Sequence, residues 1–193
     1  MEKNFKFNKR LDFYIGMAFG AFTLLFLVLF FTNDSFFKWA FNRHHNVLSW
    51  YIRPLFIISI AFFAYKRSWT GVMASIFSLF TSMFWFPAPQ NVNLQVIEFL
   101  KFEQEYLKGS WDASKIFIQL SVPIFFAALI YSAWKHSWKY LLVVIVAAAV
   151  LKILWSAMFA GDSGLSIIKP AITGLILCIG LVVYFRKRKK STS

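Results

Sequence analysis

Six runs of apolar residues, each close to the length of a membrane crossing, dominate the pattern of hydrophobic and polar positions. A helix needs about 20 apolar residues to cross the hydrocarbon of a bilayer at 1.5 Å per residue. No water is present there to bind peptide groups, so each crossing segment should be an α-helix. We therefore expect an all-α, polytopic membrane protein with one domain over 1–193 and six transmembrane helices, at about 13–32, 48–65, 69–86, 116–134, 140–159 and 166–185.

The stretch between the third and fourth runs, at about 91–108, follows a different pattern. At 100° per residue its apolar residues share one helical face and its charged residues share the other. This pattern predicts an amphipathic helix that lies in the outer membrane interface. Glu103 is the exception, because it falls in the middle of the apolar face, where a carboxylate needs a cation. We expect Arg53 or Lys152 to be that cation.

Two six-residue segments are similar, "AYKRSW" at 64–69 and "AWKHSW" at 133–138, and we call them the two copies of the repeated phrase. Extended backwards, the alignment places Pro54 opposite Pro123. It predicts that the second and third spans and the fourth and fifth spans are two copies of one hairpin in the same orientation, which is a parallel repeat. The alternative is a shared anchor, because tryptophan beside lysine or arginine is common where a span meets the membrane surface.

Composition and charge placement support a membrane protein. Of 193 residues, 59% are hydrophobic and 15% are charged, whereas about a quarter of a soluble domain is charged. The net charge of +13 could indicate nucleic acid, but most lysines and arginines precede the first run, follow the last, or lie in the turns after the second and fourth runs. Such clusters mark the cytoplasmic face. We therefore expect no nucleic-acid partner, a cell-membrane location, and cytoplasmic termini that include the basic tail at 186–193.

The basic N-terminal segment is like the start of a secretion signal. Its apolar run is as long as a full span, however, and it does not end in the small residues of a cleavage site. We therefore expect a retained first span.

Three cations lie inside the apolar runs, at Arg53, Lys152 and Lys169. A charge at the centre of a spanning helix costs roughly 2.5–3.5 kcal/mol, so each should have a partner or reach water. All three lie toward the outer ends of their spans, as does Trp85 in a run of three aromatic residues. With Glu103 they predict an outward-facing basic and aromatic pocket, since Arg and Lys bind carboxylate and phosphate groups. An ion pair that only docks the outer helix, or lysines that reach the headgroups, would explain the same residues.

This pocket would bind or pass an anionic small molecule or a lipid headgroup. A second hypothesis is a membrane enzyme that acts on lipid headgroups, with His44 or His45 of the first outer loop as acid or base and Glu103 or Asp34 beside it. A third is a non-catalytic accessory subunit whose polar residues dock a partner protein. Membrane lipids and an anion are the expected partners, and the pattern leaves a homo-oligomer or a membrane partner protein open.

The sequence offers little for metal or cofactor chemistry. On a helix, adjacent side chains such as His44 and His45 diverge by about 100°, and His136 is expected on the opposite side of the membrane. We therefore expect no metal site. The one cysteine, Cys178, cannot form a disulfide within the chain. No phosphate loop or dinucleotide fingerprint is present, so we expect no cofactor.

Overall fold

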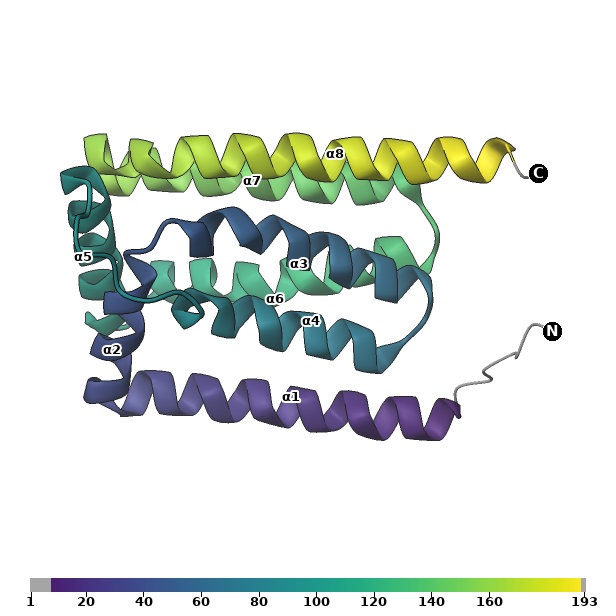
Figure 1. Cartoon of the computed structure of the whole chain (residues 1–193), viewed down its shortest axis with the longest axis horizontal. Coiled ribbons are helices and arrows are strands. Elements are labelled where there is room, and N and C mark those ends of the chain that lie inside the picture. The colour runs from purple at the N-terminus through teal and green to yellow at the C-terminus, as the bar shows by residue number, and fades with distance from the viewer. Residues whose placement is uncertain (1–7, 192–193) are drawn as a thin grey trace.

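The computed structural model describes the backbone of residues 8–191. Every regular element in this part of the chain is a helix (Figure 1). The elements are α1 (Lys9–Thr32), α2 (Asp34–His44), α3 (Leu48–Tyr65), α4 (Trp69–Thr81), η1 (Ser82–Phe84), α5 (Leu94–Lys108), α6 (Ala113–Trp134), α7 (Trp138–Ala160), η2 (Gly161–Ile167) and α8 (Ile168–Ser191), where η denotes a 3₁₀ helix.

Four stretches of the described residues are long and apolar enough to cross a membrane: Lys9–Thr32, Leu48–Tyr65, Ala113–Trp134 and Trp138–Tyr184. The last one contains both α7 and α8, which are joined by η2 and lie side by side (Figure 1). A shorter apolar stretch, Trp69–Phe84, comprises α4 and η1. The all-helical class and the apolar spanning helices are thus as expected.

The long helices run along one common direction, and α2 and α5 lie across one end of them (Figure 1). The start of α1 and the end of α8 lie at the opposite end, which we call the terminal end. A largely aromatic core fills the α2–α5 end, and a largely aliphatic core lies between the long helices. The first core contains Phe26, Phe30, Phe37, Phe41, Trp50 and Phe99. The α2–α5 end is therefore a packed cap over the bundle.

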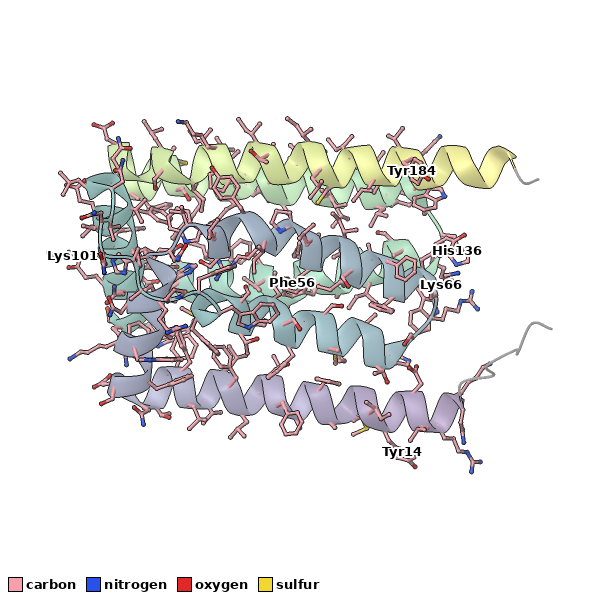
Figure 2. All side chains as sticks on the ribbon, viewed as in Figure 1. Tyr14, Phe56, Lys66, Lys101, His136 and Tyr184 are labelled. Carbon is pink, nitrogen blue, oxygen red and sulfur yellow. The ribbon has the colours of Figure 1, made fainter. Side chains whose placement is uncertain are left out.

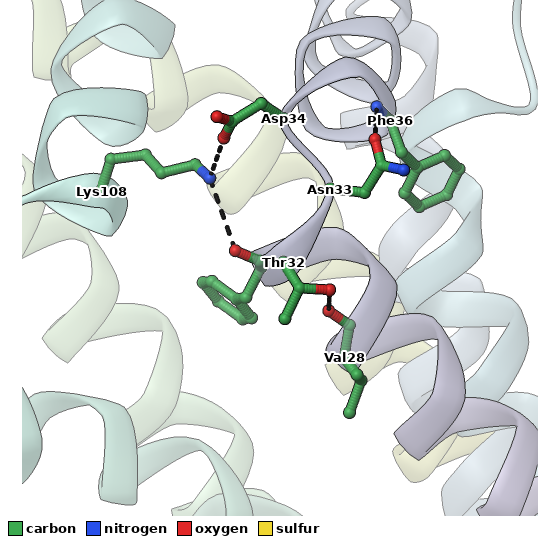
Figure 3. Close-up of polar contacts among 7 residues, drawn as sticks. Val28, Thr32, Asn33, Asp34, Phe36 and Lys108 are labelled. Carbon is green, nitrogen blue, oxygen red and sulfur yellow. Dashed lines mark hydrogen bonds and ion pairs between the residues drawn. The ribbon is translucent and has the colours of Figure 1, made fainter.

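The segment expected as the first outer loop is instead mostly the helix α2. Asn33 caps it, because its side-chain oxygen accepts a hydrogen bond from the Phe36 amide at 2.9 Å (Figure 3). Phe37 and Phe41 bury one face of the helix in the aromatic core. The pattern missed α2 because its apolar face is short and is interrupted by charged residues, so packing of that face into the aromatic core, rather than the segment alone, stabilises the helix.

Helix α5 has the expected amphipathic pattern but begins at Leu94, three residues later than predicted. Its last residue, Lys108, donates to Asp34 Oδ1 at 2.6 Å and to the Phe31 carbonyl at 3.5 Å (Figure 3). This ion pair ties α5 to the junction between α1 and α2, and the Lys108 ammonium lowers the pKa of Asp34. Near the same helix end, Lys115 donates to two carbonyls, Leu107 O and Gly109 O.

The two copies of the repeated phrase form turns with one backbone geometry. Arg67 and His136 occupy matching positions, with φ of 58° and 56°. In each turn the next residue donates its amide to a carbonyl five positions earlier, which is the hydrogen bond of a Schellman motif: Ser68 to Phe63, and Ser137 to Ser132. Both turns lie at the terminal end, where Figure 2 shows Lys66 and His136. This local agreement is what a hairpin repeat predicts.

Asp12 of α1 fixes the first of these turns. Its carboxylate accepts hydrogen bonds from Ser68 Oγ at 2.8 Å, the Trp69 amide at 2.7 Å and the Thr70 amide at 3.2 Å. It therefore caps the N-terminus of α4 from another helix, at the end where the partial positive charge of the helix dipole favours an anion. The hydrophobic pattern gave no reason to single out Asp12.

Candidate functional site

A cavity of about 390 Å³ lies between the α2–α5 cap and the long helices. We call it the basic cavity. Its polar wall consists of four side chains from four different helices: His44 of α2, Arg53 of α3, Glu103 of α5 and Lys152 of α7. Its other walls are apolar and come mainly from α3, α7 and α8. Charged groups gathered at one side of an apolar cavity are typical of a ligand site.

Lys152 and Glu103 form the ion pair expected from the sequence. Lys152 Nζ lies 3.0 Å from Glu103 Oε1, and the Glu103 side chain is only 20% exposed. The ammonium also lies 4.8 Å from the centre of the Trp155 ring and 5.6 Å from that of Phe99. A carboxylate and two aromatic faces thus balance the charge of Lys152.

Arg53 has no comparable partner. Its Nε is buried and makes no hydrogen bond, and the ion pairs found in the described part of the chain do not include it. Glu103 acts on it electrostatically, but that carboxylate is bonded to Lys152. A buried donor without a partner costs about 1–3 kcal/mol, and more when it is charged. Two cations against one carboxylate give the basic cavity an excess positive charge.

The hydrogen bonds of His44 define its tautomer. Its Nδ1 lies 2.9 Å from Ser49 Oγ, and that hydroxyl donates its only proton to the Asn46 carbonyl at 2.8 Å. Ser49 Oγ must therefore accept, so Nδ1 of His44 carries the proton and Nε2 carries a lone pair. A neutral imidazole of this kind can accept a hydrogen bond or a proton at Nε2.

Burial lowers the pKa of His44 well below 6.5, and the nearby charges of Arg53 and Lys152 lower it further. Below pH 6.5 the unfolded chain binds a proton at this histidine and the folded chain does not. The free energy of unfolding should therefore decrease as the pH is lowered below 6.5, by up to about 1.4 kcal/mol per pH unit, until the folded pKa is reached. Thermal melting in a neutral detergent between about pH 8 and pH 5 tests this over the range where histidine titrates.

In the same melting experiment, the variant His44→Gln should flatten the decline below pH 6.5. The matched control is His45→Gln, because the His45 ring is only half-buried and bonds the Phe41 carbonyl of its own helix at 2.9 Å. An unchanged pH profile in His44→Gln would show that His44 is not the titrating group. Protonation of Asp34 does not interfere, because the Lys108 ammonium lowers its pKa and it titrates at a lower pH than this range.

The structure does not bring Lys169, Trp85 and His45 into the basic cavity. Lys169 is exposed on α8, whereas its neighbour Pro170 is buried and lines the cavity. Adjacent helical residues point about 100° apart. The position of Lys169 in its apolar run therefore did not determine which face of α8 its side chain would occupy. Trp85 is 49% exposed, donates from Nε1 to Thr81 Oγ1 at 3.2 Å and packs against Phe56.

Sequence reasoning missed the apolar half of the site. Gly174 of α8 lies against the Pro54 ring of α3, and a Cβ at Gly174 would overlap that ring. This contact sets the spacing of two helices that line the cavity. The available signals were a proline in one span and a glycine in another, but nothing in the sequence pairs them.

The arrangement suits an anion better than a metal ion. Among the residues that the structure describes, no group of three or more His, Cys, Asp and Glu side chains could hold a metal ion. Guanidinium and ammonium groups bind carboxylate and phosphate oxygens. The site can thus neutralise and orient an anion, and His44 Nε2 can accept a proton.

No protein-family model matches the chain, and neither a curated protein nor a solved structure shows significant similarity to it.

Proposed function

We propose that the protein is a six-span membrane protein whose basic cavity faces outward and binds an anionic group. In this arrangement α1, α3, α4 with η1, α6, α7 and α8 cross the cell membrane, α5 lies in the outer interface and both termini are cytoplasmic. The common direction of these helices supports the proposal (Figure 1). So does the placement of Lys66 and His136 at the terminal end, opposite Lys101 of α5 (Figure 2), because basic turns favour the cytoplasm.

The observation that carries the binding proposal is the buried Nε of Arg53, which has no hydrogen-bond partner. A guanidinium presents a planar fork of donors that matches two oxygens of a carboxylate or phosphate. Lys152 lies in the same cavity and is 44% exposed, so it can turn toward an anion without losing all contact with Glu103. A free anion and a lipid headgroup share this chemistry.

Thermal melting in a neutral detergent tests the proposal, with inorganic phosphate and phosphatidylglycerol as separate ligands. At a ligand concentration of 100 times Kd, binding to the folded state adds about 2.7 kcal/mol. For a chain of this size that should raise the Tm by roughly 5–10 °C. Phosphatidylcholine, which has no net charge, should give no comparable rise. A response to phosphatidylglycerol alone would identify a lipid headgroup as the source of the anion.

Arg53→Gln should abolish the rise in Tm, because the glutamine side chain is polar but lacks the positive charge and the planar set of donors of a guanidinium. The matched control is Lys101→Gln, which removes a cation whose side chain is 76% exposed on the outer face of α5. A rise of equal size in Arg53→Gln and wild type would overturn the proposal, as would the absence of any rise with either anion.

The tautomer of His44 favours a second candidate function. A lone pair on Nε2 in a cavity with Arg53 and Lys152 is the arrangement of a general base beside an anion-binding group. Its substrate would be an anionic lipid headgroup. The test is turnover of radiolabelled phosphatidylglycerol in proteoliposomes, which His44→Gln should abolish and His45→Gln should preserve. Without turnover in the wild type, this function is excluded for that lipid.

A further inference from the structure

A second cavity, of about 380 Å³, lies between α3, α6, α7 and α8, and its lining includes residues of the two turns at the terminal end. We call it the apolar cavity. Its walls are aliphatic and aromatic, and its polar lining residues gather at the turns where α3 ends and α7 begins. These residues are Tyr65, Lys66, Ser132, His136 and Ser137.

The two cavities follow one another along the same helices. On α7, residues 145–152 line the basic cavity and residues 138–145 line the apolar cavity. The same order holds on α3, where the basic cavity ends at Ile57 and the apolar cavity begins at Ile58. On α8 the change falls between Cys178 and Leu181. The cavities thus lie end to end rather than on different sides of the bundle.

Ile145 lines both cavities. Its side chain is 6% exposed and belongs to the aliphatic core of the bundle. A buried apolar side chain between two cavities can separate them, because apolar constrictions exclude water and charged groups. Ile145 therefore lies at the boundary between two spaces that together extend over most of α7.

We propose that the two cavities are the halves of one path through the bundle for an anion with an apolar tail, closed in this conformation at Ile145. The proposal rests on the proposed function of the basic cavity and extends it from binding to passage. Arg53 and Lys152 would hold the anionic head at one end, and Lys66 offers a cation at the other.

The apolar walls between these ends indicate an amphiphile rather than an inorganic ion. A bare ion in the middle of the path would lose its hydration without gaining hydrogen bonds, which is very unfavourable. An alkyl tail, by contrast, gains free energy from contact with apolar walls. Cavities of a few hundred Å³ have the size of small-ligand sites.

The test measures uptake of radiolabelled hexanesulfonate into proteoliposomes that contain the full chain. This probe is an anion with a short tail, and its strongly acidic head stays ionised, so it crosses a protein-free bilayer slowly. Ile145→Ala should raise the uptake rate about tenfold over wild type, which is a barrier change of about 1.4 kcal/mol. Ile145→Trp should reduce uptake to the rate of protein-free vesicles.

The matched control is Val146→Ala, since Val146 is the adjacent β-branched residue, is 37% exposed and lines neither cavity. Equal uptake by Ile145→Ala and Val146→Ala would overturn the path. A parallel assay follows fluorescent phosphatidylglycerol from one leaflet to the other. Acceleration of both probes by Ile145→Ala would mean that the path accepts lipids, and acceleration of hexanesulfonate alone would mean that it takes free amphiphiles.

The melting experiment separates this inference from the proposed function. If anions raise the Tm through Arg53 but Ile145→Ala leaves uptake unchanged, the basic cavity binds anions and the path does not exist. If Ile145→Ala raises uptake although no anion raises the Tm, the path exists and the binding role of Arg53 is wrong. Failure of both measurements overturns both proposals.

Discussion

Asp12→Ala should lower the free energy of unfolding by about 3 kcal/mol, because one carboxylate that accepts several hydrogen bonds holds α1 to the start of α4. The substitution leaves the amides of Trp69 and Thr70 without their acceptor in a region that is closed by α1. For a chain of 193 residues the Tm should fall by roughly 6–12 °C. Melting in a neutral detergent measures this directly.

Two further variants control this result. Asp12→Asn keeps one acceptor oxygen and loses the charge, so its loss of stability should be about half as large. Glu98→Ala removes an exposed carboxylate from the outer face of α5 and should change the stability by less than about 0.5 kcal/mol. If Asp12→Ala melts at the same temperature as Glu98→Ala, the capping bonds contribute nothing to stability.

Gly174→Ala should be the second large effect, because the new methyl group would overlap the Pro54 ring. A pyrrolidine ring cannot turn away, so α8 must move from α3. Overpacking of this kind costs typically about 1–3 kcal/mol. Gly174 also lines the basic cavity, so the displacement should weaken the anion-dependent rise in Tm as well as the stability.

The same helix supplies the control. A Cβ on Gly180 would meet no atom within 4 Å, so Gly180→Ala changes only the helix propensity. It should stabilise α8 by about 0.5–1 kcal/mol. If Gly174→Ala lowers the stability and Gly180→Ala raises it, the loss at Gly174 comes from the contact with Pro54. A stabilised Gly174→Ala variant would show that α3 and α8 are farther apart than described.

The sequence predicted those features of the fold that depend on composition over a whole segment. The bounds of α3 agree with the predicted second span, because an apolar run and the residues that end it are both local signals. The amphipathic pattern of α5 likewise identified Glu103 as the acid that needed a cation, and the structure supplies Lys152. In both cases the cause of the structure lies within the segment or follows from the cost of burying a charge.

Apart from the Glu103–Lys152 pair, contacts between distant segments were not predictable. Asp12 accepts a hydrogen bond from Ser68, which is 56 residues away. Its other two carboxylate bonds come from the backbone amides of Trp69 and Thr70, which every residue type except proline has, so the sequence does not indicate them. Lys169 was expected to face the pocket, but it is exposed on α8 and does not line the cavity, whereas Pro170 does. Apolar residues occur all round α8, so no pattern in the sequence indicated which of its faces is inward. The cavity also required the approach of Gly174 to Pro54, a contact between two spans that no pattern pairs.

The two turns with the same backbone differ in how they are anchored. The first is locked to α1 by a charged group, whereas Ser137 of the second makes no capping bond with its side chain. At the second turn, the His136 ring centre lies 4.1 Å from that of Tyr65, and His136 Nε2 lies 3.1 Å from the Tyr65 carbonyl oxygen. The α6–α7 hairpin, which carries Ile145, is thus tied at this end to the last turn of α3 through a histidine ring, whereas the α3–α4 hairpin is tied to α1 through a carboxylate.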